Sequence, residues 1–454
     1  MLTGTGLIIG FIAALVVLFV LIIKLKWDAF ISLLVVAIGI GLMSNISVRD
    51  LPGVIADGFG GTLAGVGILI GLGIIFGQFL AASGAIEKIA SSMINAFGVK
   101  RSPIALSATA TTVAIPVFFD AAFIILNKLV QSLSIKTKIS LATFVAILAI
   151  GLIVSHSLII PTPGPLIVAD QTNSDIGIFF IYGLLVAIPA TLVGGVLYGR
   201  FIGKRIPTGN RLDDVTENLE LVDTHSSQKN IPTWLAFAML ALPIVLILSN
   251  TVMNLVFVNN PEHIIPTFFA LIGDKNAALL ISVIVAMFAL KPYLIEDTNS
   301  VMNQAFNSSG MVLLITGAGG AFGKVVQETG IGDLLINMMQ GVNMPVLLLA
   351  FLFAQLLRAA LGSATVALIT TSTILGPMAA ELGASPVLLG LAICAGGIGL
   401  SLPNDSGFWV VSKFGRLTMM ETLRVWSLGG LIAGITALGF IYFLTLFQNV
   451  LPGL

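Results

Sequence analysis

Long apolar runs, separated by short polar breaks, make up most of this chain. A helix that crosses a membrane needs about 20 mostly apolar residues, because the hydrocarbon core of a bilayer is about 30 Å thick. Ten runs approach that length and are predicted to cross: residues 5–23, 27–45, 62–82, 139–160, 175–200, 232–257, 265–290, 308–327, 385–402 and 424–447. The pattern therefore predicts an all-α polytopic membrane protein.

Two further apolar segments do not fit a single crossing. Residues 103–127 contain one charged residue, Asp120, and residues 344–380 contain one, Arg358, with Gly362 and the serine after it in the middle. We expect both segments to be re-entrant hairpins, which enter and leave the membrane on the same side. Their non-helical tips are tolerated at membrane depth only where protein buries them or where they line a wet cavity.

The order of these features repeats along the chain. At an offset of 246 residues, Gly71, Gly73, Phe76, Gly77 and Gly84 fall on Gly317, Gly319, Phe322, Gly323 and Gly330. A hairpin and then a helix break, at Pro161 or Pro403, follow in each half. Each half has an odd number of crossings, so the second is predicted to be upside down. We expect two inverted-topology repeats, 1–203 and 232–454, each with a re-entrant hairpin and a broken transmembrane helix, joined by a linker at 204–231; secondary transporters commonly have this plan.

Composition and charge agree with a lipid environment. Charged residues make up 9% of the chain and hydrophobic residues 57%, whereas a soluble domain carries about 25% charged residues. The net charge is zero and no basic tract occurs, which argues against a nucleic-acid partner. The lipid bilayer is therefore the main surrounding of the chain.

Basic residues indicate the orientation, because Lys and Arg favour cytoplasmic loops. Most of them fall on one predicted side: Lys24, Lys26, Lys88, Lys100, Arg101, Lys136, Lys138, Arg200, Lys204, Arg205, Arg211, Lys413 and Arg416. We expect this side, and the linker 204–231 with it, to be cytoplasmic. Both chain termini are then expected outside.

No pattern for a cofactor or a metal site is found. Cys394 is the single cysteine, and the three histidines do not cluster with it at the spacing of a metal site. No phosphate-binding loop occurs, so ATP hydrolysis is not expected. Uphill transport by such a chain would have to use an ion gradient.

Four short polar segments interrupt the apolar chain at equivalent points of the two halves. They are Pro116–Asp120, Pro161–Pro165, Gly362–Thr365 and Pro403–Gly407. Proline blocks the continuation of a helix, and glycine permits unwound backbone. We expect the four segments to meet inside the protein.

Each segment holds residues of the types that commonly cap new helices. Asp120, Thr162, Ser363 and the run from Asn404 to Ser406 are of the types found at helix N-termini. Such termini present free N–H groups and a positive dipole end, which together favour an anion. The alternative is that these residues only cap helices for folding.

Three titratable types share this region. Arg358 has a planar fork that suits a carboxylate, so it is the candidate substrate-binding cation; the alternative is an ion pair with Asp120 or Asp405. Asp120 is the first candidate proton carrier, and Asp405 the second unless it only caps a helix. His156 is a candidate to bind a hydroxyl group or relay a proton, or is a structural residue. The predicted substrate-binding set is Arg358, Gly362, Ser363, Ala364, Thr365, His156, Thr162, Pro163, Gly164, Asn404, Asp405 and Ser406.

The motifs around these residues resemble a known family. The runs Phe118–Asp120, His156–Pro165, Gly362–Ala367 and Pro403–Trp409 are similar to those of the gluconate permease (GntP) family of proton symporters, and the match extends along essentially the whole chain. The resemblance implies proton-driven uptake of gluconate or a related small hydroxy- or amino-monocarboxylate across a bacterial inner membrane. Leu361 stands where many relatives carry glutamine, so the individual substrate stays open.

Other functions remain open at this point. A sodium-coupled carboxylate carrier of similar architecture would use oxygens such as those of Ser363, Thr365 and Asn404 for the ion. An intramembrane enzyme would use Asp120 and Asp405 as paired carboxylates. An anion channel is a third alternative. We expect a transporter and not an enzyme, with a small carboxylate and protons as partners; a homo-oligomer is possible from the sequence.

Overall fold

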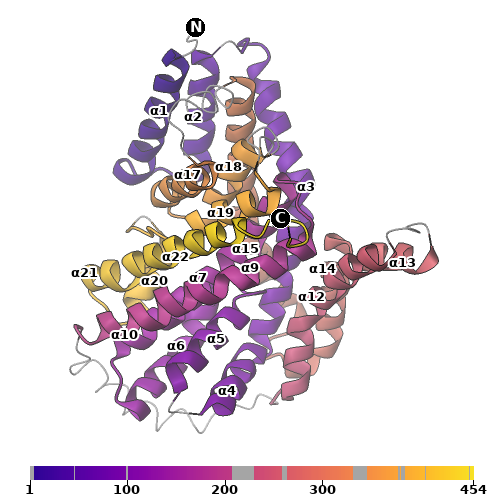
Figure 1. Ribbon diagram of the computed structural model, residues 1–454, viewed down its shortest axis with the longest axis vertical. Helices are drawn as coiled ribbons and strands as arrows, with labels where there is room; N and C mark the ends of the chain where they lie inside the picture. The colour runs from indigo at the N-terminus through magenta and orange to yellow at the C-terminus, as the bar shows by residue number, and fades with distance from the viewer. Residues whose placement is uncertain are drawn as a thin grey trace.

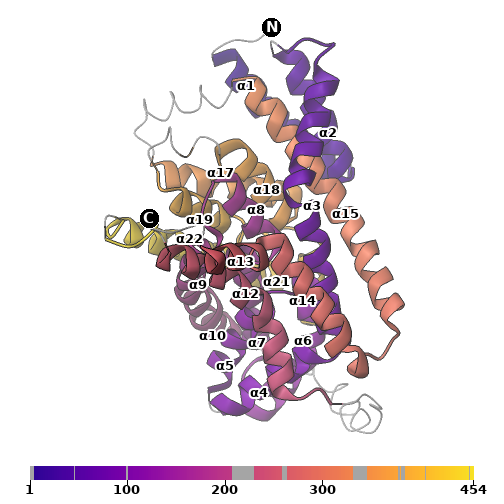
Figure 2. The same ribbon diagram turned by 90° about the vertical axis from the view of Figure 1, so that its right-hand side faces the viewer.

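The computed structural model describes most of the chain. The described residues are 5–44, 46–98, 101–206, 230–257, 263–330, 345–376, 379, 384–403, 405–448 and 450–454. Within these ranges the regular elements are all helices, as predicted (Figures 1 and 2). Most of the predicted linker, residues 207–229, and the candidate residue Asn404 lie outside the described residues.

The described part of the first half contains ten α-helices with their connections. These are α1 (Thr5–Phe19), which continues as a π-helical turn (Val20–Lys24), α2 (Ala29–Met43), α3 (Leu51–Ala82), α4 (Ala85–Phe97), α5 (Ser102–Val113), α6 (Phe119–Thr137), α7 (Leu141–Leu158), α8 (Pro163–Gln171), α9 (Ile176–Ala190) and, after a π-helical turn (Thr191–Leu197), α10 (Tyr198–Gly203).

The second half follows a similar order in its described part. Its helices are α12 (Thr233–Val256), α13 (Ile264–Ile272), α14 (Lys275–Ala289), α15 (Thr298–Glu328), α17 (Val346–Leu361), α18 (Ala364–Leu375), α19 (Pro386–Gly396), α20 (Ser406–Phe414), α21 (Met419–Thr422) and, after a π-helical turn (Leu423–Ser427), α22 (Leu428–Thr445). A short 3-10 turn (Lys291–Tyr293) follows α14.

Six helical stretches of the described chain are long and apolar enough to cross a membrane. They are Leu51–Ala82, Leu141–Gln171, Ile176–Gly203, Thr233–Asn254, Thr298–Glu328 and Met419–Thr445. The pair α13 and α14 makes a seventh if it is counted as one crossing. The predicted crossings 5–23, 27–45 and 385–402 correspond to shorter apolar helices, so their passage through the membrane stays a prediction.

Several details of the predicted helices were wrong. The boundaries of the crossing predicted at 265–290 agree with α13 and α14, but the pair is bent by 66° between them, because Asp274 caps a new helix there by accepting hydrogen bonds from the N–H groups of Asn276 and Ala277. The first hairpin segment continues to Thr137 and not to residue 127. The amphipathic helix α4 was not predicted, because its apolar residues occupy only one face.

The two helical pairs that correspond to the predicted hairpins lie at different ends of the molecule. In Figure 1, α5 and α6 are in the lower part and α17 and α18 are in the upper part, with α7, α9 and α22 between them. Residues 114–118 connect the first pair, and Gly362 and Ser363 connect the second.

A long pair of helices, α3 and α15, packs side by side (Figure 2). Their close approach requires glycine, because a Cβ atom at Gly320 would lie 1.9 Å from Oγ1 of Thr62 and 2.7 Å from the carbonyl oxygen of Gly58. Small residues commonly allow membrane helices to approach in this way. The helix α3 of the first half and the helix α15 of the second half are thus in direct contact.

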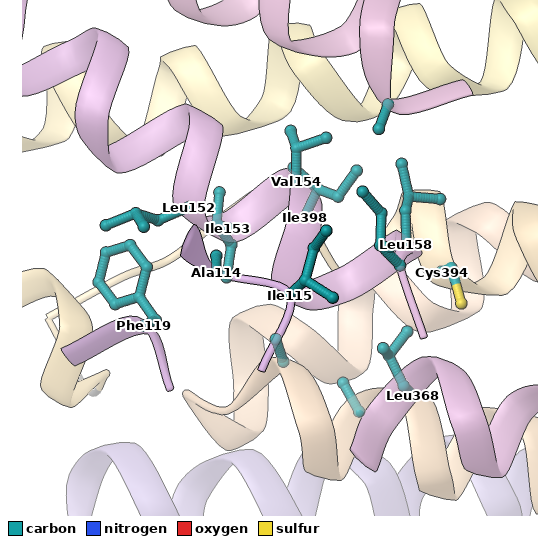
Figure 3. Close-up of a cluster of buried hydrophobic side chains, with 14 of the residues drawn as sticks. Ala114, Ile115, Phe119, Leu152, Ile153, Val154, Leu158, Leu368, Cys394 and Ile398 are labelled. Carbon is teal, nitrogen blue, oxygen red and sulfur yellow. The ribbon is translucent and has the colours of Figure 1, made fainter. Parts of the chain in front are cut away.

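The core lies around the interrupted helices. Every residue of α7 is buried, and Figure 3 shows Leu152 and Val154 of this helix beside Ile115, Leu368 and Cys394 from three other segments. On the outside, large apolar side chains are exposed on many helices, including Ile12, Val16, Ile68, Phe288 and Phe443. An exposed apolar surface of this extent fits contact with lipid.

Candidate functional site

Four helices, α6, α8, α18 and α20, begin close to one another, as the sequence predicted. A Cβ atom at Gly407 would lie 3.1 Å from the ring of Phe119, so the start of α20 packs on the start of α6. A Cβ atom at Gly164 would lie 2.9 Å from Cδ1 of Leu368, so the start of α8 packs on α18. The four polar segments therefore form two pairs, and each pair joins one helix from each half.

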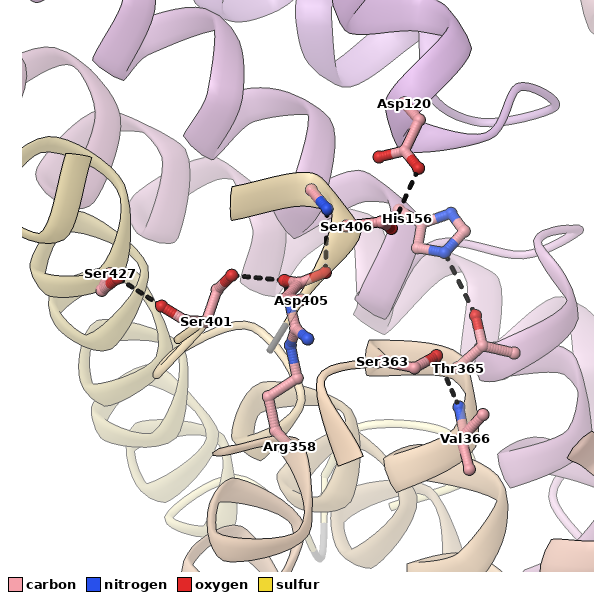
Figure 4. A network of polar contacts seen from close by, with 11 residues as sticks. Asp120, His156, Arg358, Ser363, Thr365, Val366, Ser401, Asp405, Ser406 and Ser427 are labelled. Carbon is pink, nitrogen blue, oxygen red and sulfur yellow. Dashed lines mark hydrogen bonds and ion pairs between the residues drawn. The ribbon is translucent and has the colours of Figure 1, made fainter. Parts of the chain in front are cut away.

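Arg358 connects these segments from the last turn of α17 (Figure 4). Its side chain is only 2% exposed, and its Nη2 donates to Oδ2 of Asp405 at 2.5 Å. Its Nε and Nη1 have no hydrogen-bond partner among the described residues. Buried donors without acceptors are energetically costly. An anion that accepts hydrogen bonds from these two nitrogens would remove that cost. The ion pair with Asp405 that we weighed as an alternative is present, and it does not involve these two nitrogens.

Asp405 is held by three groups. It is the N-cap of α20, and its Oδ1 accepts from the N–H of Gly407 at 2.9 Å. Its Oδ2 accepts from Arg358 and from the hydroxyl of Ser401, and Ser427 donates in turn to the carbonyl of Ser401 (Figure 4). The predicted cap is confirmed. Ser401 was missed, although it is the first hydroxyl residue after Ser385 in an apolar run; Ser427 is placed only by the fold.

Asp120 does not cap its helix, so that prediction was wrong. The helix α6 begins two residues earlier than a cap at Asp120 would place it, because Phe118, with an extended backbone, occupies the N-cap position. The half-buried carboxylate of Asp120 instead accepts a hydrogen bond from the hydroxyl of Ser406 at 3.2 Å. Asp120 and Asp405 thus lie on adjoining helix starts, and Ser406 links them.

His156 lies near the end of α7 and faces the second helical pair. Its Nε2 is 3.2 Å from the hydroxyl of Thr365, whereas its Nδ1 has no partner among the described residues, although the side chain is only 6% exposed. The ring of Phe118 packs against it, with 5.7 Å between the ring centroids. The free ring nitrogen suits a hydroxyl group of a ligand.

At the break after α7, a side chain of the break itself donates hydrogen bonds to the unwound backbone carbonyls. Thr162 occupies the N-cap position of α8 but does not bond the helix N–H groups; its hydroxyl donates to the carbonyls of His156 and Ile159 at 3.0 and 2.6 Å. The predicted side-chain cap is therefore wrong at this position, because the unwound carbonyls compete for the hydroxyl. Pro163 and Gly164 open α8 as predicted.

The turn between α17 and α18 uses glycine for its conformation. Gly362 has a φ of 66°, in the left-handed region that favours glycine. Ser363 then caps α18 by accepting from the N–H of Val366 at 3.4 Å, and Ala364 and Thr365 begin the helix. This predicted cap is confirmed.

A small cavity adjoins His156. Together with its opening it holds about 280 Å³ of space free of atoms. The lining residues are Gly73, Phe76, Pro116, Val117, Phe118, His156, Pro161, Thr162, Pro163 and Leu279. Phe76 and Leu279 were not predicted, since only the packing of α3 and α14 brings them here. The cavity is mainly apolar, with His156 and Thr162 as its polar side chains.

The described side chains of the site combine one buried guanidinium with imidazole, hydroxyl and carboxylate groups. Among the described residues, Arg358 has two nitrogens without a hydrogen-bond partner, and His156 and Asp120 offer further hydrogen-bonding atoms. In the described part of the chain, no group of three or more His, Cys, Asp or Glu side chains is arranged to hold a metal ion.

The chain matches known permeases over nearly its whole length. The model of the GntP family permease matches residues 6–447. The inner membrane permease YgbN of Escherichia coli is 35% identical over 439 residues, which cover 94% of this chain and 95% of that protein. A gluconate permease of Bacillus subtilis is 32% identical, covering 97% of this chain and 99% of its own length.

A solved structure shares the fold. The crystal structure of the YdaH transporter of Alcanivorax borkumensis, reported to have an unusual topology, superposes with a TM-score of 0.63 at 14% identity. The match covers 92% of this chain and 97% of that one. At this level of identity the likeness concerns the fold alone.

Proposed function

The chain belongs to the GntP family of permeases, and we propose that it is a secondary transporter that takes up gluconate or a related small hydroxy- or amino-monocarboxylate together with protons. The expectation of a transporter and not an enzyme is confirmed, because the family and the named relatives are permeases. The names of two relatives, an inner membrane permease and a gluconate permease, support the bacterial inner membrane as location and gluconate as substrate.

The observation that carries the proposal is the buried guanidinium of Arg358, whose Nε and Nη1 have no hydrogen-bond partner in the described part of the chain. A charge inside a membrane protein is expensive and usually marks a ligand or ion pathway. Arginine recognises a carboxylate by two parallel hydrogen bonds. A small carboxylate is therefore the ligand that best completes the hydrogen bonding of Arg358.

The hydroxyl groups of a sugar acid would meet the remaining polar atoms of the site. Nδ1 of His156 has no partner within the described ranges, and the hydroxyl of Thr365 lies next to this ring. Asp120 and Ser406 offer further oxygens on the side of α20. A site with hydrogen-bonding groups for hydroxyls rejects analogues that lack them, because its own buried polar atoms are then left unpaired.

The proton carrier in this proposal is Asp120. Its carboxylate accepts one hydrogen bond among the described side chains, from Ser406, whereas Asp405 has three donors. An ionised carboxylate with few partners is costly away from water. Protonation should therefore be energetically more favourable at Asp120 than at Asp405. Asp405 remains the second candidate for the proton carrier.

We further propose that residues 1–203 and 232–454 are inverted repeats, that α5–α6 and α17–α18 are re-entrant hairpins, and that both termini lie outside. The similar order of helices and the placement of the two pairs at different ends of the molecule support this arrangement. A site at which helix starts from both halves meet is typical of secondary transporters with inverted repeats.

Competition in membrane vesicles tests the substrate. Labelled gluconate uptake is measured with unlabelled gluconate, shorter hydroxy acids, D-serine and the uncharged parent sugar glucose as competitors. We expect carboxylates with hydroxyl or amino groups to compete and glucose to have no effect. Equal competition by glucose, or no specific gluconate uptake at all, would contradict the proposal.

A further inference from the structure

The described site holds more negative than positive side chains. Arg358 supplies one guanidinium, while Asp405 contacts it directly and Asp120 lies on the adjoining helix start. A carboxylate substrate adds a further negative charge to this group. The number of substrate carboxylates that the site can bind is therefore limited by how many hydrogen-bond donors of Arg358 Asp405 already occupies.

The geometry of the guanidinium specifies that limit. Arginine has five N–H donors arranged as two forks, each of which holds one carboxylate. Nη2 takes part in both forks with one hydrogen each, and one contact from Nη2 goes to Asp405. Asp405 thereby uses one hydrogen of the nitrogen that both forks share, while Nε and Nη1 have no partner among the described residues. The second hydrogen of Nη2 leaves one fork for one further carboxylate.

Asp405 is fixed in this position and not merely nearby. Its Oδ1 is bonded to the N–H of Gly407, and Ser401 supports its Oδ2. The side chain is only 7% exposed, so it has little freedom to turn away when a ligand arrives. We therefore expect the ion pair between Asp405 and Arg358 to remain when a ligand binds.

We propose that Asp405 is a specificity-determining residue, which by occupying one side of Arg358 restricts the site to ligands with a single carboxylate. The inference rests on the proposed function and adds to it the residue that sets the permitted charge. A dicarboxylate as long as the monocarboxylate substrate would bring a second negative charge into a site whose one guanidinium is already shared with Asp405. Repulsion between these like charges would weaken binding of the dicarboxylate.

The test compares gluconate with glucarate, which has the same six-carbon chain and a carboxylate at each end. Binding of both to the purified protein is measured by calorimetry, for the wild type and for Asp405→Asn. Asparagine retains an oxygen for the N–H of Gly407 and removes the charge. We expect the ratio of glucarate to gluconate affinity to rise at least about tenfold in the variant, since a whole buried charge is removed.

Two further variants make the result specific. Asp120→Asn removes a charge from the same site without touching Arg358, and it should change the ratio by less than Asp405→Asn does. Asp405→Ser keeps a capping hydroxyl and should shift the ratio in the same direction, which covers the case in which the asparagine variant does not fold.

The outcomes separate the two proposals. If the wild type does not bind gluconate, the proposed function is wrong. If it binds gluconate but the ratio is unchanged in the folded Asp405 variants, or changes equally in Asp120→Asn, the role of Asp405 is wrong. Loss of gluconate binding in both folded Asp405 variants would also overturn it, because Asp405 would then be required for binding.

Discussion

Arg358 and Asp405 form a buried ion pair, with 2.5 Å between Nη2 and Oδ2, although they lie 47 residues apart in the chain. The pair joins the end of α17 to the start of α20, two of the segments at which helices are interrupted. Removal of one partner of such a pair typically costs about 3–5 kcal/mol, because the other charge stays buried. Conservative substitutions are therefore the informative ones.

Arg358→Lys keeps the charge and removes the fork. We expect gluconate affinity to fall by about 10- to 100-fold, because a charge-assisted hydrogen bond contributes about 1.5–3 kcal/mol and each 1.4 kcal/mol is a factor of ten. Calorimetry on the purified variant measures this. Arg49→Lys, at an exposed position, is the matched control and should bind as the wild type does. Unchanged affinity in Arg358→Lys would exclude direct contact with the carboxylate.

Asp120→Asn imitates the protonated carboxyl group. Accumulation of substrate needs a proton to be taken up and released in each cycle, whereas exchange of substrate for substrate does not. We expect this variant to lose accumulation driven by a pH gradient and to retain counterflow, both measured in the same proteoliposomes. Asp50→Asn, at an exposed position without a side-chain cap, should retain both activities. A variant at Asp120 that still concentrates substrate would transfer the coupling role to Asp405 or His156.

The topology is tested by labelling single cysteines with a reagent that does not cross membranes. A cysteine at Pro452, which is exposed, should react only from outside, and one at Ser227, in the predicted linker, only from the cytoplasm. Cys394 is fully buried, so the unmodified protein should give a low background. Reaction of both cysteines from the same side would rule out inverted repeats with an odd number of crossings.

Gly320→Ala should destabilise the packing of α3 on α15. The new Cβ atom would lie within 2.7 Å of the backbone carbonyl of Gly58, which cannot move aside as a side chain can. Overpacking of this kind costs about 1–3 kcal/mol. Thermal unfolding of the purified protein should show a lower midpoint. Gly71→Ala provides the control, because nothing lies within 4 Å of its Cβ position; an equal midpoint for both variants would contradict the close packing.

The sequence was informative at positions where a charged residue or a helix break has a high free-energy cost inside a membrane. A lone arginine in an apolar run made Arg358 a candidate binding residue, and four polar breaks with proline or glycine predicted the interrupted helices. Both features are costly at membrane depth unless protein or a wet cavity surrounds them. The caps at Ser363 and Asp405 followed from residue type. These features depend on local chemistry, which the sequence shows directly.

What the sequence could not provide depends on the path of the backbone and on distant contacts. The residue type of Asp120 predicts a helix cap, but the backbone places the N-cap of α6 two residues earlier, at Phe118. The choice of Asp405 over Asp120 as partner of Arg358, and the support from Ser427, follow from the packing of separate helices. The bend at Asp274 had a local signal in the Gly-Asp pair that the apolar pattern around it concealed.

Uptake of labelled gluconate into proteoliposomes with an imposed pH gradient tests the central claim most directly. With the lumen more alkaline than the outside and no sodium present, we expect gluconate to accumulate above its external concentration and to leave again when a protonophore is added. A sodium gradient at equal pH on both sides should have no effect. Accumulation that requires sodium, or uptake that never exceeds the external concentration on a pH gradient, would contradict proton-coupled transport.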